Sequence, residues 1–148
     1  MSDYVLCLIP ETPEFLPFPE TIHAFLCEIA KLKLGAEATY TIENNIVFVD
    51  AGENWGKIIC PLCKEQLSDE WWSQAMGTAW ETKFSILTSR TPCCGLIVSL
   101  NELEYEWKVG FSRFVARLHN PEKKLSANDL AALEQVIGCK LRCIDAYV

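Results

Sequence analysis

Two short cysteine turns constrain this chain more than any other feature of its sequence. A C-P-L-C turn contains Cys60 and Cys63, and a P-C-C-G turn contains Cys93 and Cys94. Zinc in proteins takes about four sulfur or nitrogen ligands at roughly 2.0–2.3 Å, and two facing turns with two thiolates each supply that number. We therefore predict a Zn²⁺ site formed by these four cysteines.

A disulfide framework is the other interpretation of eight cysteines in 148 residues. Disulfides belong to secreted chains, and the sequence shows no secretory signal, because Asp3 stands in place of a basic segment and the first apolar run stops at Pro10. We therefore expect a cytoplasmic protein with reduced thiols. Four cysteines lie in apolar segments, where a free thiol behaves as a small hydrophobic side chain, and we expect them in the core: Cys7, Cys27, Cys139 and Cys143.

The two turns look like the knuckles of a zinc ribbon, with one departure. A ribbon carries a cysteine at the first position of its second knuckle, where this chain has Thr91. The resemblance places Cys94 in the usual second-ligand position and leaves the fourth ligand open. The candidates are Cys93, the two histidines His23 and His119, and a water molecule.

A wider resemblance covers about positions 58–148. Together with the two turns, the pair Trp71-Trp72, the SLNEL stretch from Ser99 and the GFSRF stretch from Gly110 resemble a group of uncharacterised bacterial proteins. No activity is known for that group. The resemblance supports the existence of the module and implies no function.

Hydrophobic patterning outside the turns predicts an α+β fold. Helical spacing predicts helices over 20–34 and 126–138, and apolar runs predict strands, at 4–9, 38–49, 104–118 and 139–148. Their order is the β-α-β-β-α-β order of a ferredoxin-like fold, an antiparallel sheet with two helices on one face. We predict such a domain from residues 1–50 and 104–148, with residues 51–103 inserted as a zinc-ribbon-like subdomain.

Several element boundaries are predicted by local signals. Gly35 is the expected end of the first helix, and Gly110 the point at which the third strand breaks. The second strand is either a hairpin or one long bent strand, because Glu43-Asn44-Asn45 interrupts it. Ser68 and Ser126 are expected helix N-caps. The five tryptophans are expected to form the core of the insert, and an exposed surface that anchors a partner is the alternative.

The chain is acidic, with a net charge of −7. This charge argues against nucleic acid as a partner, and no apolar run reaches the ~18–20 residues that span a bilayer. Eight acidic and two basic residues fall within positions 1–50. Such a face suits a basic protein partner, although a solvated surface that keeps the chain soluble is the other interpretation.

These features favour a binding protein over an enzyme. A catalytic zinc keeps an open position and favours histidine ligands, and neither histidine here has ligand spacing to a cysteine turn. We predict a non-enzymatic, zinc-stabilised protein-binding module, with an immunity or antitoxin role as one hypothesis. The alternatives are a zinc-dependent or thiol/redox enzyme that uses Cys94 or the Cys60/Cys63 pair, and a nucleic-acid-binding zinc ribbon. The partner and the oligomeric state stay open.

Overall fold

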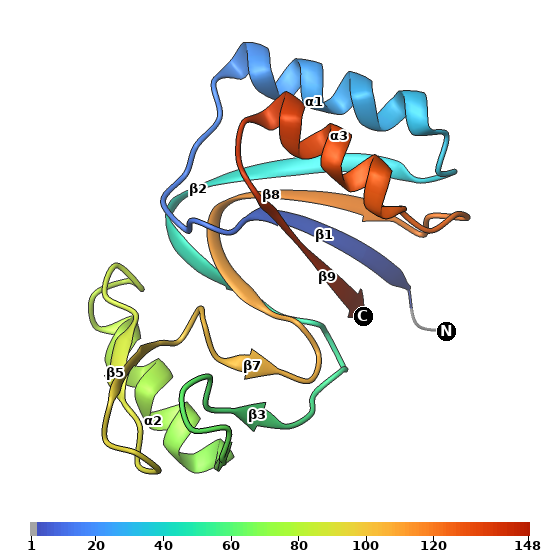
Figure 1. Cartoon of the computed structure of the whole chain (residues 1–148). Coiled ribbons are helices and arrows are strands. Elements are labelled where there is room, and N and C mark those ends of the chain that lie inside the picture. The colour runs from blue at the N-terminus through green and yellow to red at the C-terminus, as the bar shows by residue number, and fades with distance from the viewer. Residues whose placement is uncertain (1–2) are drawn as a thin grey trace.

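The computed structural model describes residues 3–148 and contains three helices and three antiparallel sheets (Figure 1). The largest sheet has four strands, in the order β2 (Glu37–Val49), β8 (Gly110–His119), β1 (Tyr4–Pro10) and β9 (Leu141–Tyr147). All three neighbouring pairs in it are antiparallel. The prediction of a mixed α and β chain is confirmed.

A second group of elements lies between β2 and β8 in the sequence and below the large sheet in Figure 1. We call it the cysteine lobe. It consists of β3 (Ile58–Ile59), β4 (Gln66–Leu67), α2 (Asp69–Trp80), β5 (Thr88–Arg90), β6 (Ile97–Ser99) and β7 (Glu104–Tyr105). Strands β4, β3 and β7 form one small sheet, and β5 and β6 form a hairpin.

Helices α1 (Pro19–Leu32) and α3 (Ala127–Ile137) cover one face of the large sheet (Figure 1). Phe25 of α1 and Phe114 of β8 are fully buried between helix and sheet, with their rings edge to face and their centroids 6.3 Å apart. Burial of large apolar side chains of this kind is the main favourable term in folding. The first helix therefore holds its place through side-chain packing against β8.

The helix ends test the predicted caps. The Ser126 hydroxyl accepts a bond from the Asp129 N–H, and the Asp129 carboxylate accepts one from the Ser126 N–H, so the predicted capping box is confirmed. The Ser68 hydroxyl caps α2 with a single bond that it accepts from the Trp71 N–H (3.1 Å), so this predicted cap is confirmed as well. The prediction that Gly35 ends the first helix is wrong by two residues, because Lys33 itself adopts the left-handed conformation (φ 51°) that turns the chain out of the helix.

Strand β2 is one long bent strand and not a hairpin. It pairs with β8 from Glu37 to Ile42 and again from Val47, and the register shifts between the two stretches. Within the shifted segment, the backbone carbonyl of Glu43 accepts a hydrogen bond from the side chain of Arg113 (Nε, 3.0 Å). A bulge of this kind bends and twists a strand pair, and Figure 1 shows β2 and β8 curling together toward the cysteine lobe.

The predicted long strand at 104–118 is divided into β7 and β8, and β8 begins at Gly110. A Cβ atom at Gly110 would lie 2.6 Å from Ile9 Cδ1, so a larger residue at this position would require the Ile9 side chain to shift. Residues 106–109 form a non-regular connector between the two strands. This connector carries Trp107 to the edge of the large sheet.

The part of the chain that the structure describes contains three hydrophobic clusters, one under the helices, one on the opposite face of the sheet and one in the cysteine lobe. Cys7 is buried in the second cluster, and Cys139 and Cys143 pack against the first. The expectation that Cys27 is a core residue is wrong. Its side chain is exposed on α1, with its sulfur 3.7 Å from His23 Nε2.

None of the helices within residues 3–148 is long and apolar enough to cross a bilayer. In the same residues every buried side-chain nitrogen or oxygen has a hydrogen-bond partner. A half-buried arginine joins the cysteine lobe to the large sheet. Arg142 Nη1 of β9 lies 3.0 Å from the Asn101 carbonyl, 2.9 Å from Asn101 Oδ1 and 3.0 Å from the Val109 carbonyl.

Removing this connection should destabilise the chain. We expect Arg142→Ala to lower the free energy of unfolding by about 2–3 kcal/mol, because it leaves the buried Asn101 amide oxygen without its charged donor. Urea unfolding followed by circular dichroism measures the change. The matched control is Lys140→Ala, since that exposed side chain makes only a 3.9 Å ion pair, and we expect it to cost less than about 0.5 kcal/mol. Equal losses in the two variants would contradict the role of Arg142.

Candidate metal centre

The first cysteine turn connects β3 to β4 and is closed by two backbone hydrogen bonds. The N–H of Lys64 donates to the carbonyl of Cys60 (3.0 Å), and the N–H of Cys60 donates to the carbonyl of Glu65 (2.9 Å). Lys64 has a left-handed backbone (φ 65°), which reverses the chain directly after Cys63. The turn therefore holds both of its cysteine side chains on the inside of a tight loop.

The second turn connects β5 to β6 and repeats this pattern. The N–H of Gly95 donates to the carbonyl of Thr91 (3.0 Å), and the N–H of Thr91 donates to the carbonyl of Leu96 (3.0 Å). Gly95 takes the left-handed conformation (φ 71°) that Lys64 takes in the first turn. The two loops thus share one backbone geometry, and Thr91 occupies the position that corresponds to Cys60.

The four cysteine sulfurs face one another across the two turns, and all lie within 4.8 Å of each other. Cys60 Sγ is 3.9 Å from Cys94 Sγ, and Cys63 Sγ is 3.2 Å from Cys93 Sγ. A tetrahedral zinc with bonds of about 2.3 Å places its sulfur ligands about 3.8 Å apart. The prediction that these four residues lie together is confirmed, and the donor set suits a soft metal ion.

Cys93 is the residue that completes the cluster. In the shared backbone geometry it corresponds to Leu62, whose side chain is exposed, and Cys93 is itself exposed. Its sulfur nevertheless turns toward Cys63. The two histidines that the sequence offered as candidate fourth ligands lie away from the cluster. His23 contacts Cys27 on α1, and His119 Nε2 is 3.0 Å from Thr39 Oγ1 at the end of β8.

Hydrogen bonds from the turns stabilise two of the thiols as thiolates. The backbone N–H of Cys63 is the main cause that lowers the pKa of Cys60 to about 6, against the opposing effect of burial. The hydroxyl of Thr91, 3.2 Å from Cys94 Sγ, is the main cause that lowers the pKa of Cys94. Metal ligation requires deprotonated sulfur, so these donors prepare the two inner cysteines for a cation.

Thr91 is the functional residue that sequence reasoning missed. Its side chain is buried (2% exposed), and the pattern of a zinc ribbon marks it only as a departure. Its hydroxyl lies 3.2 Å from Cys94 Sγ and is placed to donate a hydrogen bond to a thiolate there, similar to the second-sphere groups that orient metal ligands. The signal that could have identified Thr91 is the equivalence of the two turns, in which Thr91 takes the position of Cys60.

The outer cysteine pair has a different environment. The N–H of Glu65 favours the Cys63 thiolate, but the adjacent sulfur of Cys93, together with burial and the other two sulfurs, outweighs it and raises the pKa of Cys63 to about 12. The raised pKa means that Cys63 keeps its proton more tightly than a free thiol does. A cation that binds all four sulfurs has to displace that proton.

Two tryptophans of α2 pack in the same hydrophobic cluster as three of the four cysteines, and their indole N–H groups bond to the segments around the second turn. Trp71 Nε1 donates to the carbonyl of Arg90 (3.2 Å), directly before the second turn. Trp72 Nε1 donates to the Tyr105 hydroxyl (3.0 Å), which in turn donates to the carbonyl of Leu100 (2.7 Å). The expectation of a tryptophan core is confirmed for these two half-buried residues. It is wrong for Trp55, Trp80 and Trp107, which are 40–53% exposed.

Comparisons of the chain with models of known protein families, with curated proteins and with solved structures found no match. The resemblance to uncharacterised bacterial proteins therefore rests on the sequence motifs alone. The geometry of the four cysteines is the evidence on which a function has to be argued.

The equivalence of the two turns generates a test of which cysteines bind metal. We expect Cys93→Ser to weaken Co²⁺ binding at least tenfold, because it removes one of four sulfur donors. Adding Thr91→Cys to that variant should restore tight binding, since position 91 corresponds to Cys60 and already faces Cys94. Titration of the thiolate–Co²⁺ absorption bands measures both effects.

Cys27→Ser serves as the control and should leave the titration unchanged, because that thiol lies on α1 outside the cluster. A double variant that binds no better than Cys93→Ser would contradict the equivalence. Unchanged binding by Cys93→Ser would show that Cys93 is not a ligand.

Proposed function

We propose that this chain is a zinc-stabilised protein-binding module without catalytic activity. The observation that carries the proposal is the set of four cysteine sulfurs within 4.8 Å of one another. Four thiolates fill the coordination sphere of a tetrahedral zinc and leave no position for water or substrate, which is the pattern of structural zinc sites. Zinc is the metal that sulfur-only tetrahedral sites most often select, apart from iron.

A structural metal suits the size of the cysteine lobe. Its helix α2 buries mainly two alanines, Ala75 and Ala79, and its strands are two or three residues long. Small units of this kind bury little apolar surface and commonly depend on a metal or on disulfides. All eight cysteines of the described chain are free thiols, which supports a reducing, cytoplasmic location.

Exposed apolar side chains on the same lobe support protein binding. Five of them are more than half exposed, the first three of them in or beside the cysteine turns: Leu62, Leu96, Ile97, Trp80 and Ile86. Apolar surface left open on a rigid, metal-bound loop is typical of protein interaction sites. The net charge of −7 favours a basic partner. An immunity or antitoxin role is one form that such binding would take.

We also propose that the large sheet with α1 and α3 is a ferredoxin-like unit. Support comes from the strand order β2-β8-β1-β9 and from the two helices that share one face (Figure 1). The cysteine lobe would then be a zinc-ribbon-like insertion between its second and third strands.

A thiol/redox protein is the second candidate, and the outer sulfur pair favours it. Cys63 and Cys93 have sulfurs 3.2 Å apart, and Cys93 is exposed to solvent oxidants. Such a protein would cycle between dithiol and disulfide and would need those thiols free of metal. Metal content therefore separates the two candidates.

Elemental mass spectrometry of the purified protein is the first test. We expect about one zinc per chain, with four of the eight thiols protected from a thiol reagent until a chelator is added. The control is the reagent-accessible Cys27, which should react at once in either state. A metal-free protein in which Cys63 and Cys93 oxidise reversibly would contradict the zinc proposal and support the redox candidate.

Site-specific photo-crosslinking tests the binding surface. A photoreactive residue at position 97, on the metal lobe, should capture a basic protein that the same residue at position 31, on the exposed face of α1, does not capture. Capture should disappear after chelation, because the turn that presents Ile97 loses its metal. Equal capture from both positions, or capture that chelation does not change, would contradict the proposed surface.

A further inference from the structure

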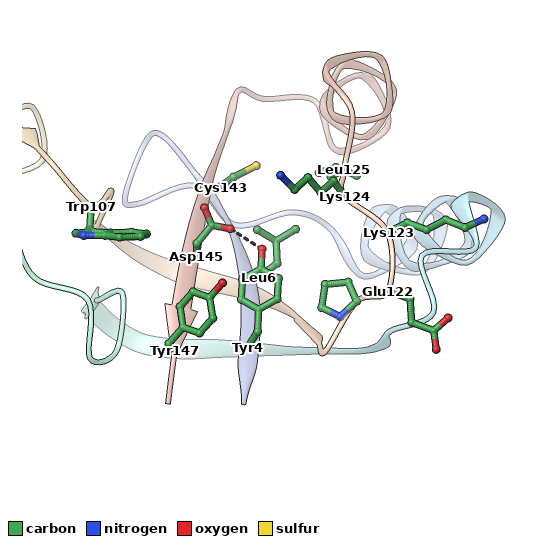
Figure 2. A pocket seen from close by; sticks show the side chains of 11 residues that line it. Tyr4, Leu6, Trp107, Glu122, Lys123, Lys124, Leu125, Cys143, Asp145 and Tyr147 are labelled. Carbon is green, nitrogen blue, oxygen red and sulfur yellow. Dashed lines mark hydrogen bonds between the residues drawn. The ribbon is translucent and has the colours of Figure 1, made fainter. Parts of the chain in front are cut away.

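A pocket with a volume of about 550 Å³ opens beside β1 and β9, on the helix-covered side of the sheet and next to the turn that leads into α3 (Figure 2). It lies outside the metal centre and shares no residue with it. Its walls come from four separate parts of the chain: β1, β9, the connector between β7 and β8, and residues 121–125.

Aromatic rings form one end and the floor of this pocket. Trp107 stands at one end with 40% of its surface exposed, and Figure 2 shows its ring edge-on beside Asp145 and Cys143. On the floor, Tyr4 and Tyr147 stack with ring centroids 5.1 Å apart. A flat π-face left open to solvent inside a pocket is a platform for a planar ring.

A carboxylate occupies the middle of the pocket. Asp145 Oδ1 accepts a hydrogen bond from the Tyr4 hydroxyl, which fixes the orientation of the carboxylate (Figure 2). Its second oxygen is free to accept another donor. A ligand hydroxyl is a suitable donor there, whereas a purely apolar ligand would leave a desolvated carboxylate oxygen unpaired.

Basic side chains line the end opposite Trp107. Lys123 and Lys124 belong to the pocket wall, and neither is in an ion pair among residues 3–148. In Figure 2 the ammonium of Lys124 is directed back toward Cys143, whereas the ammonium of Lys123 is directed away from Asp145 and the two tyrosines. Glu122 also lines the pocket, but its carboxylate lies against Gly35, where an added Cβ would meet it at 2.8 Å. The Lys124 ammonium is therefore the cation that faces an anionic ligand group.

These three features follow one another along the pocket in the order ring platform, hydroxyl acceptor, cations. We propose that the pocket binds a free nucleoside diphosphate or monophosphate. Its base stacks on Trp107, a sugar hydroxyl donates to Asp145, and its phosphate contacts Lys124. An inorganic anion would use only Lys124, and an aromatic ligand without phosphate would leave that lysine without a partner. This site stands independently of the proposed zinc-stabilised binding function.

Isothermal titration calorimetry on the chain as purified tests the proposal. The probes are ADP and GDP, with adenosine, inorganic phosphate and a 5′-phosphorylated oligonucleotide in parallel titrations. We expect at least one of the two nucleotides to bind saturably, and both adenosine and phosphate to bind at least about tenfold more weakly, because adenosine lacks the phosphate and inorganic phosphate lacks the base and the sugar. The affinity should fall as salt is raised.

Variants assign the contacts. Trp107→Leu, Lys124→Gln and Asp145→Asn should each weaken nucleotide binding about tenfold, the size expected for loss of one stacking or charge-assisted contact. The matched controls are Trp80→Leu and Lys83→Gln, an exposed tryptophan and lysine of the cysteine lobe that line no part of this pocket. They should bind as the unmodified chain does. Circular dichroism establishes that each variant is folded before it is titrated.

Several results would overturn the proposal. These are no binding of either nucleotide, phosphate or adenosine binding as tightly as the nucleotides, or equal losses in the pocket and control variants. Tighter binding of the oligonucleotide than of either free nucleotide would also overturn it and would assign the pocket to the end of a nucleic-acid strand.

Discussion

The pairing of β2 with β8 is the interaction on which the rest of the structure depends. The upper part of this pair carries Phe114 into the core under the helices, and the lower part carries Ile46 and Phe111 into the core of the cysteine lobe. The bulge between the two parts redirects the strands, and the Ser112 hydroxyl satisfies the backbone of Phe114 at that point (2.7 and 3.2 Å). One strand pair therefore supports two hydrophobic cores, and the lobe is built on the curled end of the sheet.

Local signals predicted the parts of the structure that depend on local contacts. The caps at Ser68 and Ser126 are confirmed because a capping hydroxyl bonds within its own helical turn. The end of α1 could not be read in the same way, since a left-handed Lys33 has no sequence signature comparable to glycine. The choice between a hairpin and a bent strand depended on pairing with β8, which lies about 70 residues away in the sequence, as in the contact of Arg113 with Glu43.

The two candidate sites also differ in how far local sequence signals predict them. The candidate metal centre consists of two contiguous turns, so its four cysteines could be grouped from their spacing alone. The contribution of Cys93 could not be predicted in this way, because it depends on the fold that turns this exposed residue toward Cys63. The pocket of Figure 2 has no contiguous motif. Tyr4 and Asp145 are 141 residues apart in the chain and meet only because β1 pairs with β9. Sequence periodicity identified both strands but carried no information about what their side chains build together.

The connector between β7 and β8 links the two sites mechanically. β7 pairs with β3, with Glu104 opposite Ile59, and Cys60 follows Ile59 directly. Two residues beyond β7 the chain reaches Trp107, and it then enters the large sheet at Gly110. A metal that fixes the first cysteine turn therefore also fixes β3, β7 and the start of the connector. Because Arg142 binds the Val109 carbonyl at the other end, the position of Trp107 is set from both sides, by the cysteine centre and by the sheet. A ligand that stacks on this ring would bind most tightly when the lobe is ordered, since a platform that is already in place costs no ordering entropy.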